Sequence, residues 1–87
     1  MIQKCVKIKN KSGVHARPAS AIVKELKKYD AKINLVQGEE EVNAKSLMGI
    51  MSLGITKGSE ISIEAEGEEA KEAVNALVEL IESGFNE

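Results

Sequence analysis

Each strand-like segment of this chain is hydrophobic on one face only, and this pattern restricts the possible folds more than any other feature. In residues 60–65, EISIEA, the side chains of Ile61 and Ile63 alternate with polar ones, which is the period of a half-buried β-strand. The other strand-like segments are residues 2–9, residues 32–37 and a short segment that ends near Asn43. A sheet of such strands buries one face, so we expect all helices to pack against that face.

Three further segments have the spacing of amphipathic helices. Hydrophobic residues recur every three or four positions in residues 16–28, 46–53 and 68–83. Pro18 lies near the start of the first segment, where a residue without an N–H is well tolerated, and Gly84 follows the last. The order β-α-β-β-α-β-α predicts an α+β domain with two layers, one antiparallel sheet and one layer of helices. The pattern alone leaves the strand order open, and a ferredoxin-like arrangement fits it equally well.

The length and composition are those of a single folded domain over residues 1–87. Hydrophobic residues make up 43% of the chain and charged residues 30%, which argues against intrinsic disorder. The single cysteine, Cys5, excludes an internal disulfide and a cysteine-based zinc cluster, and it fits a reducing compartment. Neither a signal-peptide pattern nor a membrane-spanning stretch is evident, so we expect a cytoplasmic protein that does not insert into membranes.

Nucleic-acid binding is disfavoured on two grounds. The formal net charge is −2, whereas nucleic-acid-binding domains usually have a net positive charge. A sheet that binds RNA also needs solvent-facing aromatic side chains, and the only aromatic residues are Tyr29 and Phe85, neither of which lies in a predicted strand. We therefore expect no direct nucleic-acid partner.

Residues 12–20, SGVHARPAS, contain the most distinctive group of side chains. His15 is the only histidine, and it lies between a Ser-Gly turn and a predicted helix start, close to Arg17 and Pro18. The first turn of a helix presents unpaired N–H groups and the positive end of the helix dipole, which together bind anions. Arg17 adds a planar set of donors suited to phosphate oxygens. An imidazole in this setting is well placed to carry a phosphoryl group.

Three other roles for His15 compete with this one. A lone histidine is often a partly buried structural residue, but a surface position at a helix start offers little packing. Metal binding would require further ligands, and we expect neither a metal nor another cofactor. General-base catalysis would require a nucleophilic partner and a deep cleft, and neither is expected on a small sheet with helices on one face. A group carrier, and not a conventional enzyme, is therefore the favoured interpretation.

Residues 43–54, NAKSLMGIMSLG, contain a second unusual concentration of side chains. Ser46 is placed to cap a short helix, which alone would be an ordinary feature. However, two methionines, a leucine and an isoleucine within this helix are more than one short helix needs to bury. We expect some of them to remain exposed as an adaptable binding patch.

The stretches GVHARPAS and VNAKSLMGIMSLGITKG resemble the two signature segments of the HPr family, the histidine-containing phosphocarrier proteins of the bacterial phosphoenolpyruvate-dependent sugar phosphotransferase system. The resemblance extends over nearly the whole chain, with the same order of elements. It implies an open-faced β-sandwich, in which three helices cover one face of a four-stranded antiparallel sheet with the strand order 1-4-2-3.

The resemblance also implies roles for individual residues. His15 would accept a phosphoryl group on Nδ1 from phosphorylated enzyme I and donate it to IIA domains of sugar permeases. The phosphate would be bound at the helix start by Ala16, Arg17 and Pro18, with Arg17 supporting its charge. The residues that would dock partner proteins are Ser20, Lys24, Lys27, Leu47, Met48 and Met51.

Ser46 resembles the regulatory serine of one branch of the family. An HPr kinase/phosphorylase would phosphorylate it with ATP, and the modified protein would act with a catabolite-control repressor in carbon catabolite repression. A helix N-terminus tolerates such a dianionic group. The principal alternative to a phosphocarrier is therefore a regulatory module that acts mainly through phosphorylated Ser46 and the methionine-containing patch.

Two related proteins also fit parts of the pattern. One paralogue of the family keeps the serine but has lost the histidine, and the presence of His15 argues against that assignment. A carrier that serves a nitrogen-linked branch shares the histidine, but residues 43–54 resemble the sugar branch more closely.

Overall fold

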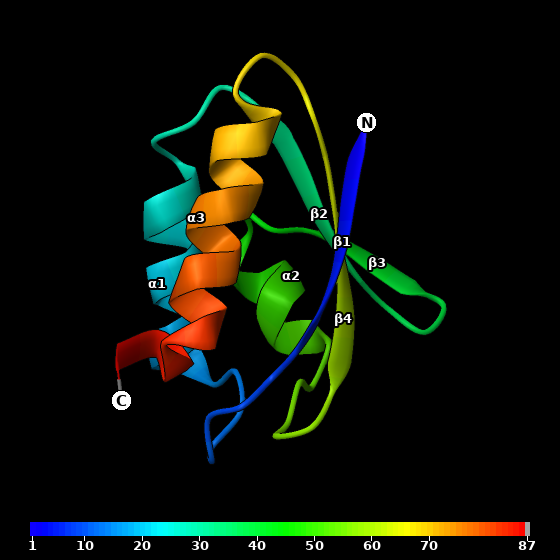
Figure 1. The fold of residues 1–87 in the computed structure, drawn as a ribbon. Helices are drawn as coiled ribbons and strands as arrows, with labels where there is room; N and C mark the ends of the chain where they lie inside the picture. The colour runs from blue at the N-terminus through cyan, green and yellow to red at the C-terminus, as the bar shows by residue number, and fades with distance from the viewer. Residues whose placement is uncertain (87) are drawn as a thin grey trace.

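The computed structural model describes residues 1–86, so the last residue of the expected 1–87 domain lies outside the described residues. Its elements are β1 (Ile2–Lys7), α1 (Ala16–Leu26), β2 (Lys32–Gln37), β3 (Glu40–Asn43), α2 (Leu47–Ser52), β4 (Glu60–Glu66), α3 (Ala70–Glu82) and the short 3₁₀ helix η1 (Gly84–Asn86). Apart from η1, this is the predicted order β-α-β-β-α-β-α. Figure 1 shows the helices gathered on one side of the strands.

The four strands form one antiparallel sheet in the order β1-β4-β2-β3. This is the order that the resemblance to the HPr family implies, and the hydrophobic pattern alone could not supply it. β4 lies between β1 and β2, so that Ile63 is opposite Lys4 on one side and opposite Leu35 on the other. Two strands that are far apart in the sequence, β1 and β4, are therefore neighbours in the sheet.

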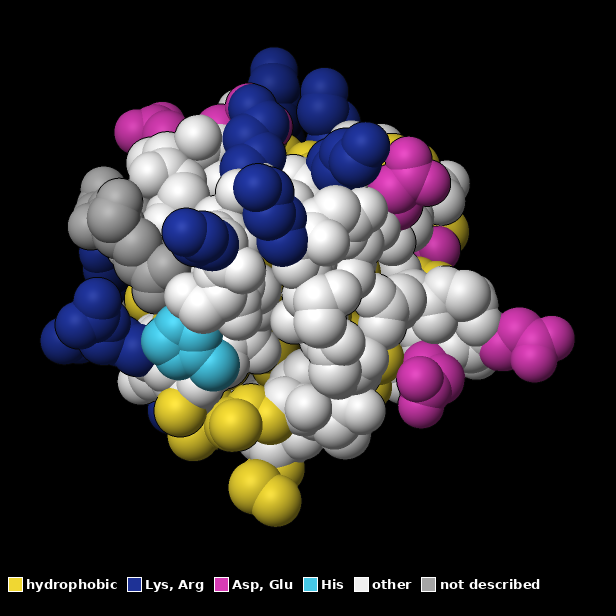
Figure 2. All heavy atoms as spheres, turned by 90° about the horizontal axis from the view of Figure 1, so that it is seen from below, with side chains coloured by type: hydrophobic (Ala, Val, Ile, Leu, Met, Phe, Trp, Pro, Cys, Tyr) yellow, Lys and Arg dark blue, Asp and Glu magenta, His cyan; other side chains and the backbone are white. Residues whose placement is uncertain are grey.

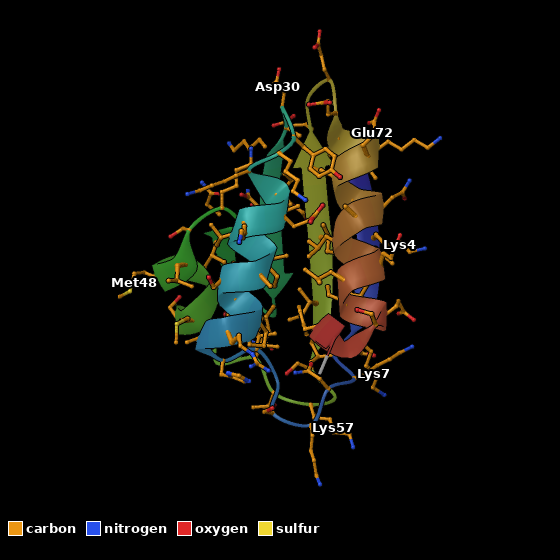
Figure 3. The ribbon with its side chains drawn as sticks, turned by 90° about the vertical axis from the view of Figure 1, so that its left-hand side faces the viewer. Lys4, Lys7, Asp30, Met48, Lys57 and Glu72 are labelled. Carbon is orange, nitrogen blue, oxygen red and sulfur yellow. The ribbon has the colours of Figure 1, made fainter. Side chains whose placement is uncertain are left out.

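The core lies between the sheet and the helices, as the one-sided strand pattern predicts. Figure 3, which views the molecule from the helix side, shows α1 and α3 next to each other in front of the strands. The largest fully buried aliphatic side chains include Ile33, Leu35, Ile61 and Ile63 from the sheet and Ile22, Leu26, Ile50 and Leu77 from the helices. One aromatic side chain, Phe85 in η1, is also buried. Within the described residues, no helix has the length and hydrophobicity needed to cross a membrane.

Three element boundaries differ from the predictions by two residues. α1 ends at Leu26 and not at Lys28, because the last turn tightens: the Lys28 N–H donates to the carbonyl oxygen of Glu25, three residues earlier, at 3.2 Å. β1 ends at Lys7 and not at residue 9, although Ile8 remains buried and its backbone bonds to residues 58 and 59. α3 begins at residue 70 and not at residue 68.

Candidate functional site

His15 occupies the N-cap of α1. Its backbone is extended, with φ −90° and ψ −165°, and its carbonyl oxygen accepts the first helical hydrogen bond from the Ala19 N–H at 3.0 Å. The residue is exposed, and its imidazole makes no capping hydrogen bond to the described first turn. The sequence prediction of a surface histidine at a helix start is therefore confirmed.

The first turn of α1 presents backbone N–H groups that the helix itself does not use. Pro18 is buried and has no N–H, and the N–H of Ala19 is used by His15. By helix geometry, the N–H groups of Ala16 and Arg17 lie outside the hydrogen-bond ladder of the helix. The described first turn also carries no acidic side chain that would neutralise the positive end of the helix dipole. This arrangement can hold a phosphate-sized anion beside the imidazole.

A stripe of exposed side chains continues from this site along α1. We call it the α1 stripe; it comprises Arg17, Ser20, Lys24 and Lys27. Their spacing of three, four and three residues places them on one side of the helix. Lys28 differs from these residues, because its Nζ donates to the Glu25 carboxylate at 3.0 Å, and this hydrogen bond raises the lysine pKa above its ordinary value.

The hydrophobic residues of α2 divide between the core and the surface. Ile50 is fully buried, whereas Leu47, Met48 and Met51 are 40%, 79% and 42% exposed. We call these three residues the α2 patch. In Figure 3 the side chain of Met48 points away from the molecule. The expectation that part of this short helix remains exposed is confirmed.

The α2 patch lies on the same face of the molecule as the histidine. α1 and α2 pack against each other. Figure 2 views this face and shows hydrophobic side chains next to the imidazole, while the acidic side chains visible in this view lie farther away. The structure therefore brings together two segments, residues 12–20 and 43–54, that the sequence analysis selected separately.

Ser46 caps α2, as predicted. Its Oγ accepts a hydrogen bond from the Gly49 N–H at 3.1 Å, and its carbonyl oxygen accepts one from the Ile50 N–H at 3.0 Å. There is little room for a side chain at Gly49: a Cβ on this residue would lie 3.2 Å from the Oγ of Ser46. Ser46 is half-buried and directly precedes the α2 patch in the chain.

Two residues before His15 have a larger structural role than the sequence analysis gave them. The sequence indicates only a Ser-Gly turn here, but Asn10 and Gly13 are both buried, and the Asn10 Nδ2 donates to the Gly13 carbonyl oxygen at 2.6 Å. Gly13 has a φ of +67°. The one sequence signal was the glycine itself, which tolerates such a conformation better than other residues.

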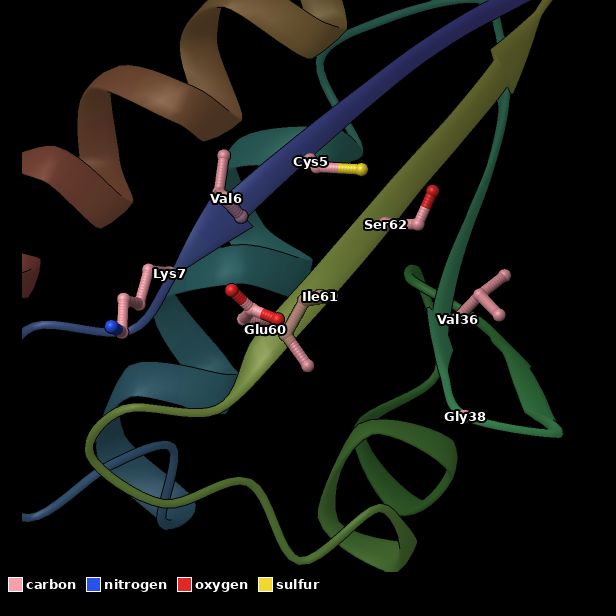
Figure 4. Close-up of a pocket in the computed structure, with 8 residues that line it drawn as sticks. All are labelled: Cys5, Val6, Lys7, Val36, Gly38, Glu60, Ile61 and Ser62. Carbon is pink, nitrogen blue, oxygen red and sulfur yellow. The ribbon is translucent and has the colours of Figure 1, made fainter.

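A separate hollow, of about 520 Å³, opens among β1, β4 and the end of β2 (Figure 4). Two of its lining residues, Cys5 and Ser62, are opposite each other in the sheet. Cys5 is an exposed free thiol. In the described part of the chain, no group of three or more His, Cys, Asp and Glu side chains is arranged to hold a metal ion. Within the described residues, the hollow therefore offers no cluster of metal ligands.

Comparison with known proteins gives consistent matches over nearly the whole chain. The family model described as "PTS HPr component phosphorylation site" matches residues 2–83. The phosphocarrier protein HPr of Treponema pallidum is 41% identical over 87 residues, which cover 100% of this chain and 99% of that protein. The HPr-like protein Crh of Halalkalibacterium halodurans is 43% identical over 82 residues, which cover 94% of this chain and 98% of that protein.

Two further matches concern a longer protein and a solved structure. The multiphosphoryl transfer protein of Haemophilus influenzae is 46% identical over 83 residues, which cover 92% of this chain but only 17% of that protein. The crystal structure of HPr-C-His from Thermoanaerobacter tengcongensis is 47% identical and covers 100% of this chain and 98% of that chain, with a TM-score of 0.96. The βαββαβα architecture described above thus has close counterparts among solved structures.

Proposed function

Because the chain belongs to the HPr family of phosphocarrier proteins, we propose that His15 accepts a phosphoryl group from phosphorylated enzyme I and donates it to IIA domains of sugar permeases. The observation that carries this proposal is the position of His15, at the N-cap of a helix whose first turn has two N–H groups outside the helical ladder and no carboxylate. In this proposal the protein is a carrier and not an enzyme: it holds the phosphoryl group on His15 until an acceptor protein takes it.

The transfer requires little chemistry from the protein beyond positioning and charge. The lone pair on Nδ1 of His15 forms a bond to phosphorus as the bond between phosphorus and the donor breaks. The N–H groups of Ala16 and Arg17 and the guanidinium of Arg17 then stabilise the phosphoryl oxygens. Pro18 supports this arrangement because it presets the backbone of the first turn. The reverse sequence, with an IIA domain as acceptor, completes the cycle.

Partner proteins dock, in this proposal, on the α1 stripe and the α2 patch. The stripe supplies positive charge from Arg17, Lys24 and Lys27, which favours partners with an acidic surface. The patch supplies exposed methionine side chains, which adapt to differently shaped partners. This combination suits a carrier that must bind a donor and several acceptors in turn. The free thiol of Cys5 fits a reducing compartment, and we place the protein in the cytoplasm.

The test is the intact mass of the protein after incubation with phosphoenolpyruvate, magnesium and purified enzyme I. We expect one acid-labile phosphoryl group on the wild type and none on His15→Ala. An enzyme I shown to phosphorylate another carrier serves as the positive control. If the cognate enzyme I also adds nothing to the folded wild-type protein, the carrier proposal is wrong.

We also propose that Ser46 is a regulatory phosphorylation site, recognised by an HPr kinase/phosphorylase and read by a catabolite-control repressor. A phosphate on this residue would lie at a helix N-terminus, where negative charge is tolerated, and directly before the α2 patch, where it would repel an acidic partner. We expect Ser46→Asp to slow transfer from enzyme I. Ser46→Asn is the matched control, because asparagine caps a helix as well as aspartate does but carries no charge. Equal transfer rates for the two variants would reject the electrostatic mechanism.

A regulatory module without carrier activity is the second candidate function. It is supported by the 43% identity to the HPr-like protein Crh of Halalkalibacterium halodurans. Phosphorylation of His15 by enzyme I distinguishes the two candidates. Mass increments only after treatment with ATP and a serine kinase, and none with a proven cognate enzyme I, would favour the regulatory module.

A further inference from the structure

The turn before His15 is fixed by hydrogen bonds on several sides. The Gly13 N–H donates to the Asn10 carbonyl oxygen at 3.1 Å, and the Gly13 carbonyl oxygen accepts from the Asn10 Nδ2 at 2.6 Å. The next residue, Val14, donates its N–H to the carbonyl oxygen of Ile55 at 3.1 Å. The backbone that leads into the histidine is therefore attached to the segment that follows α2.

Gly13 itself lies against the backbone of this segment. A Cβ on Gly13 would lie 2.5 Å from the Ile55 carbonyl oxygen and 2.7 Å from the Thr56 Cα, whereas ordinary contacts begin at 3.4 Å. Both atoms belong to the backbone, so no change of side-chain rotamer can relieve the overlap. Val14 and Ile55 are 6% and 4% exposed, so the two chain segments that meet at this contact are both anchored in the core.

We propose that Gly13 is a positioning residue for His15. The missing Cβ allows the backbone of residues 55–56 to hold the turn at close range, and this contact sets where the imidazole stands relative to the start of α1. The inference rests on the proposed role of His15 as phosphoryl acceptor.

The consequence for transfer follows from the size of the overlap. Gly13→Ala must open the contact from 2.5 Å to at least 3.0 Å, and to 3.4 Å for an ordinary contact. We expect Val14, next to the histidine, to move with it. A misplacement on the order of 1 Å at a reacting group can reduce a rate about 10²-fold. We expect a loss of about tenfold to 10²-fold in the rate of transfer. The carrier concentration that gives half of the maximal transfer rate should change by less than about twofold, since the docking residues are unaltered.

The experiment is a single-turnover transfer from phosphorylated enzyme I over a range of carrier concentrations. Gly38→Ala is the matched control: Gly38 has a φ of +63°, close to the +67° of Gly13, but no described atom lies within 4 Å of its would-be Cβ. Both variants therefore introduce the same backbone strain, and only Gly13→Ala displaces a neighbouring segment. Gly38→Ala should transfer at the wild-type rate.

Asn10→Ala tests whether the same turn positions His15, without adding a Cβ to a glycine. It removes the 2.6 Å hydrogen bond to the Gly13 carbonyl oxygen, and we expect the same pattern, a slower transfer with little change in half-saturation. A ¹H–¹⁵N spectrum gives a readout that needs no partner protein. The His15 ring and the Ala16 and Arg17 amide signals should shift in Gly13→Ala and Asn10→Ala but not in Gly38→Ala.

The possible outcomes separate this inference from the proposed function. A folded Gly13→Ala that transfers at the wild-type rate, or one in which only half-saturation changes, overturns the inference. If Gly13→Ala does not fold, Asn10→Ala decides, and a wild-type transfer rate in that variant overturns it. If the wild type itself accepts no phosphoryl group from a cognate enzyme I, the proposed function fails. In that case unshifted His15, Ala16 and Arg17 signals in the variants would overturn the positioning role separately.

Discussion

The cap of α2 offers the most direct test of how local structure stabilises this domain. Ser46→Ala removes the hydroxyl that accepts the Gly49 N–H at 3.1 Å, and alanine offers no replacement acceptor. Loss of a serine cap costs about 1 kcal/mol in proteins. For a domain of this size, 1 kcal/mol corresponds to a decrease in Tm of roughly 4–8 °C. Ser46 is half-buried, so water has limited access to the Gly49 N–H that loses its acceptor in Ser46→Ala. We therefore expect the full cost of the lost cap and not a fraction of it.

The assay is urea unfolding followed by circular dichroism, with heat unfolding as a second measurement. Ser46→Asp and Ser46→Asn should retain wild-type stability to within a few tenths of a kcal/mol, since both residues cap helices as well as serine does. Ser52→Ala is the control for removing an exposed hydroxyl from the same helix, and it should change stability by less than about 0.5 kcal/mol. A Ser46→Ala variant as stable as the wild type, or a Ser46→Asp variant as unstable as Ser46→Ala, would refute the capping argument.

Three further predictions concern docking, charge and the core. Met48→Ala should leave unfolding unchanged, because this side chain is 79% exposed, but it should raise the half-saturating carrier concentration for transfer from enzyme I. Met1→Ala is the control, since Met1 is 86% exposed. Equal effects of the two substitutions would contradict a specific patch. The Glu25 carboxylate raises the pKa of Lys28 above 10.5. The pair therefore stabilises the fold at neutral pH, and this contribution disappears as the pH rises through the raised pKa. In Glu25→Gln, the pKa of the Lys28 Nζ, followed by NMR, should return towards 10.5. Leu77→Ala removes a fully buried side chain and should lower the free energy of unfolding in urea by about 2–5 kcal/mol. A decrease below about 1 kcal/mol would contradict this prediction.

The hydrophobic pattern was sufficient to predict the four strands and the three α-helices, because each of them buries a single face, but it did not predict η1. Ile33 and Leu35 alternate with polar residues in β2, and both are buried. The ends of elements were less predictable, because they depend on individual hydrogen bonds, such as the one from the Lys28 N–H to Glu25 that tightens the end of α1. The strand order required the resemblance to a family, since one-sided strands fit several orders equally well.

The candidate site was predictable only in part, for a related reason. His15 and Ser46 could be identified because capping and helix starts are local, and local chemistry is visible in a short stretch of sequence. The contact of Gly13 with residues 55–56 could not be identified, because the two segments are more than forty residues apart in the chain and meet only in the folded state. A glycine before a helix indicates a turn but does not reveal what packs against it.

The α1 stripe and the α2 patch should affect different steps of partner binding, if both dock partners as proposed. The charges of Arg17, Lys24 and Lys27 act at a distance and are screened within about 8 Å at physiological salt, so they mainly accelerate association. The exposed methionine side chains act only on contact, so they mainly slow dissociation. Added salt should therefore reduce the association rate of the wild type, while Met48→Ala should raise the dissociation rate at any salt concentration. A carrier with this division associates rapidly through charge and is held by only a small hydrophobic contact, which allows it to leave one partner before it meets the next.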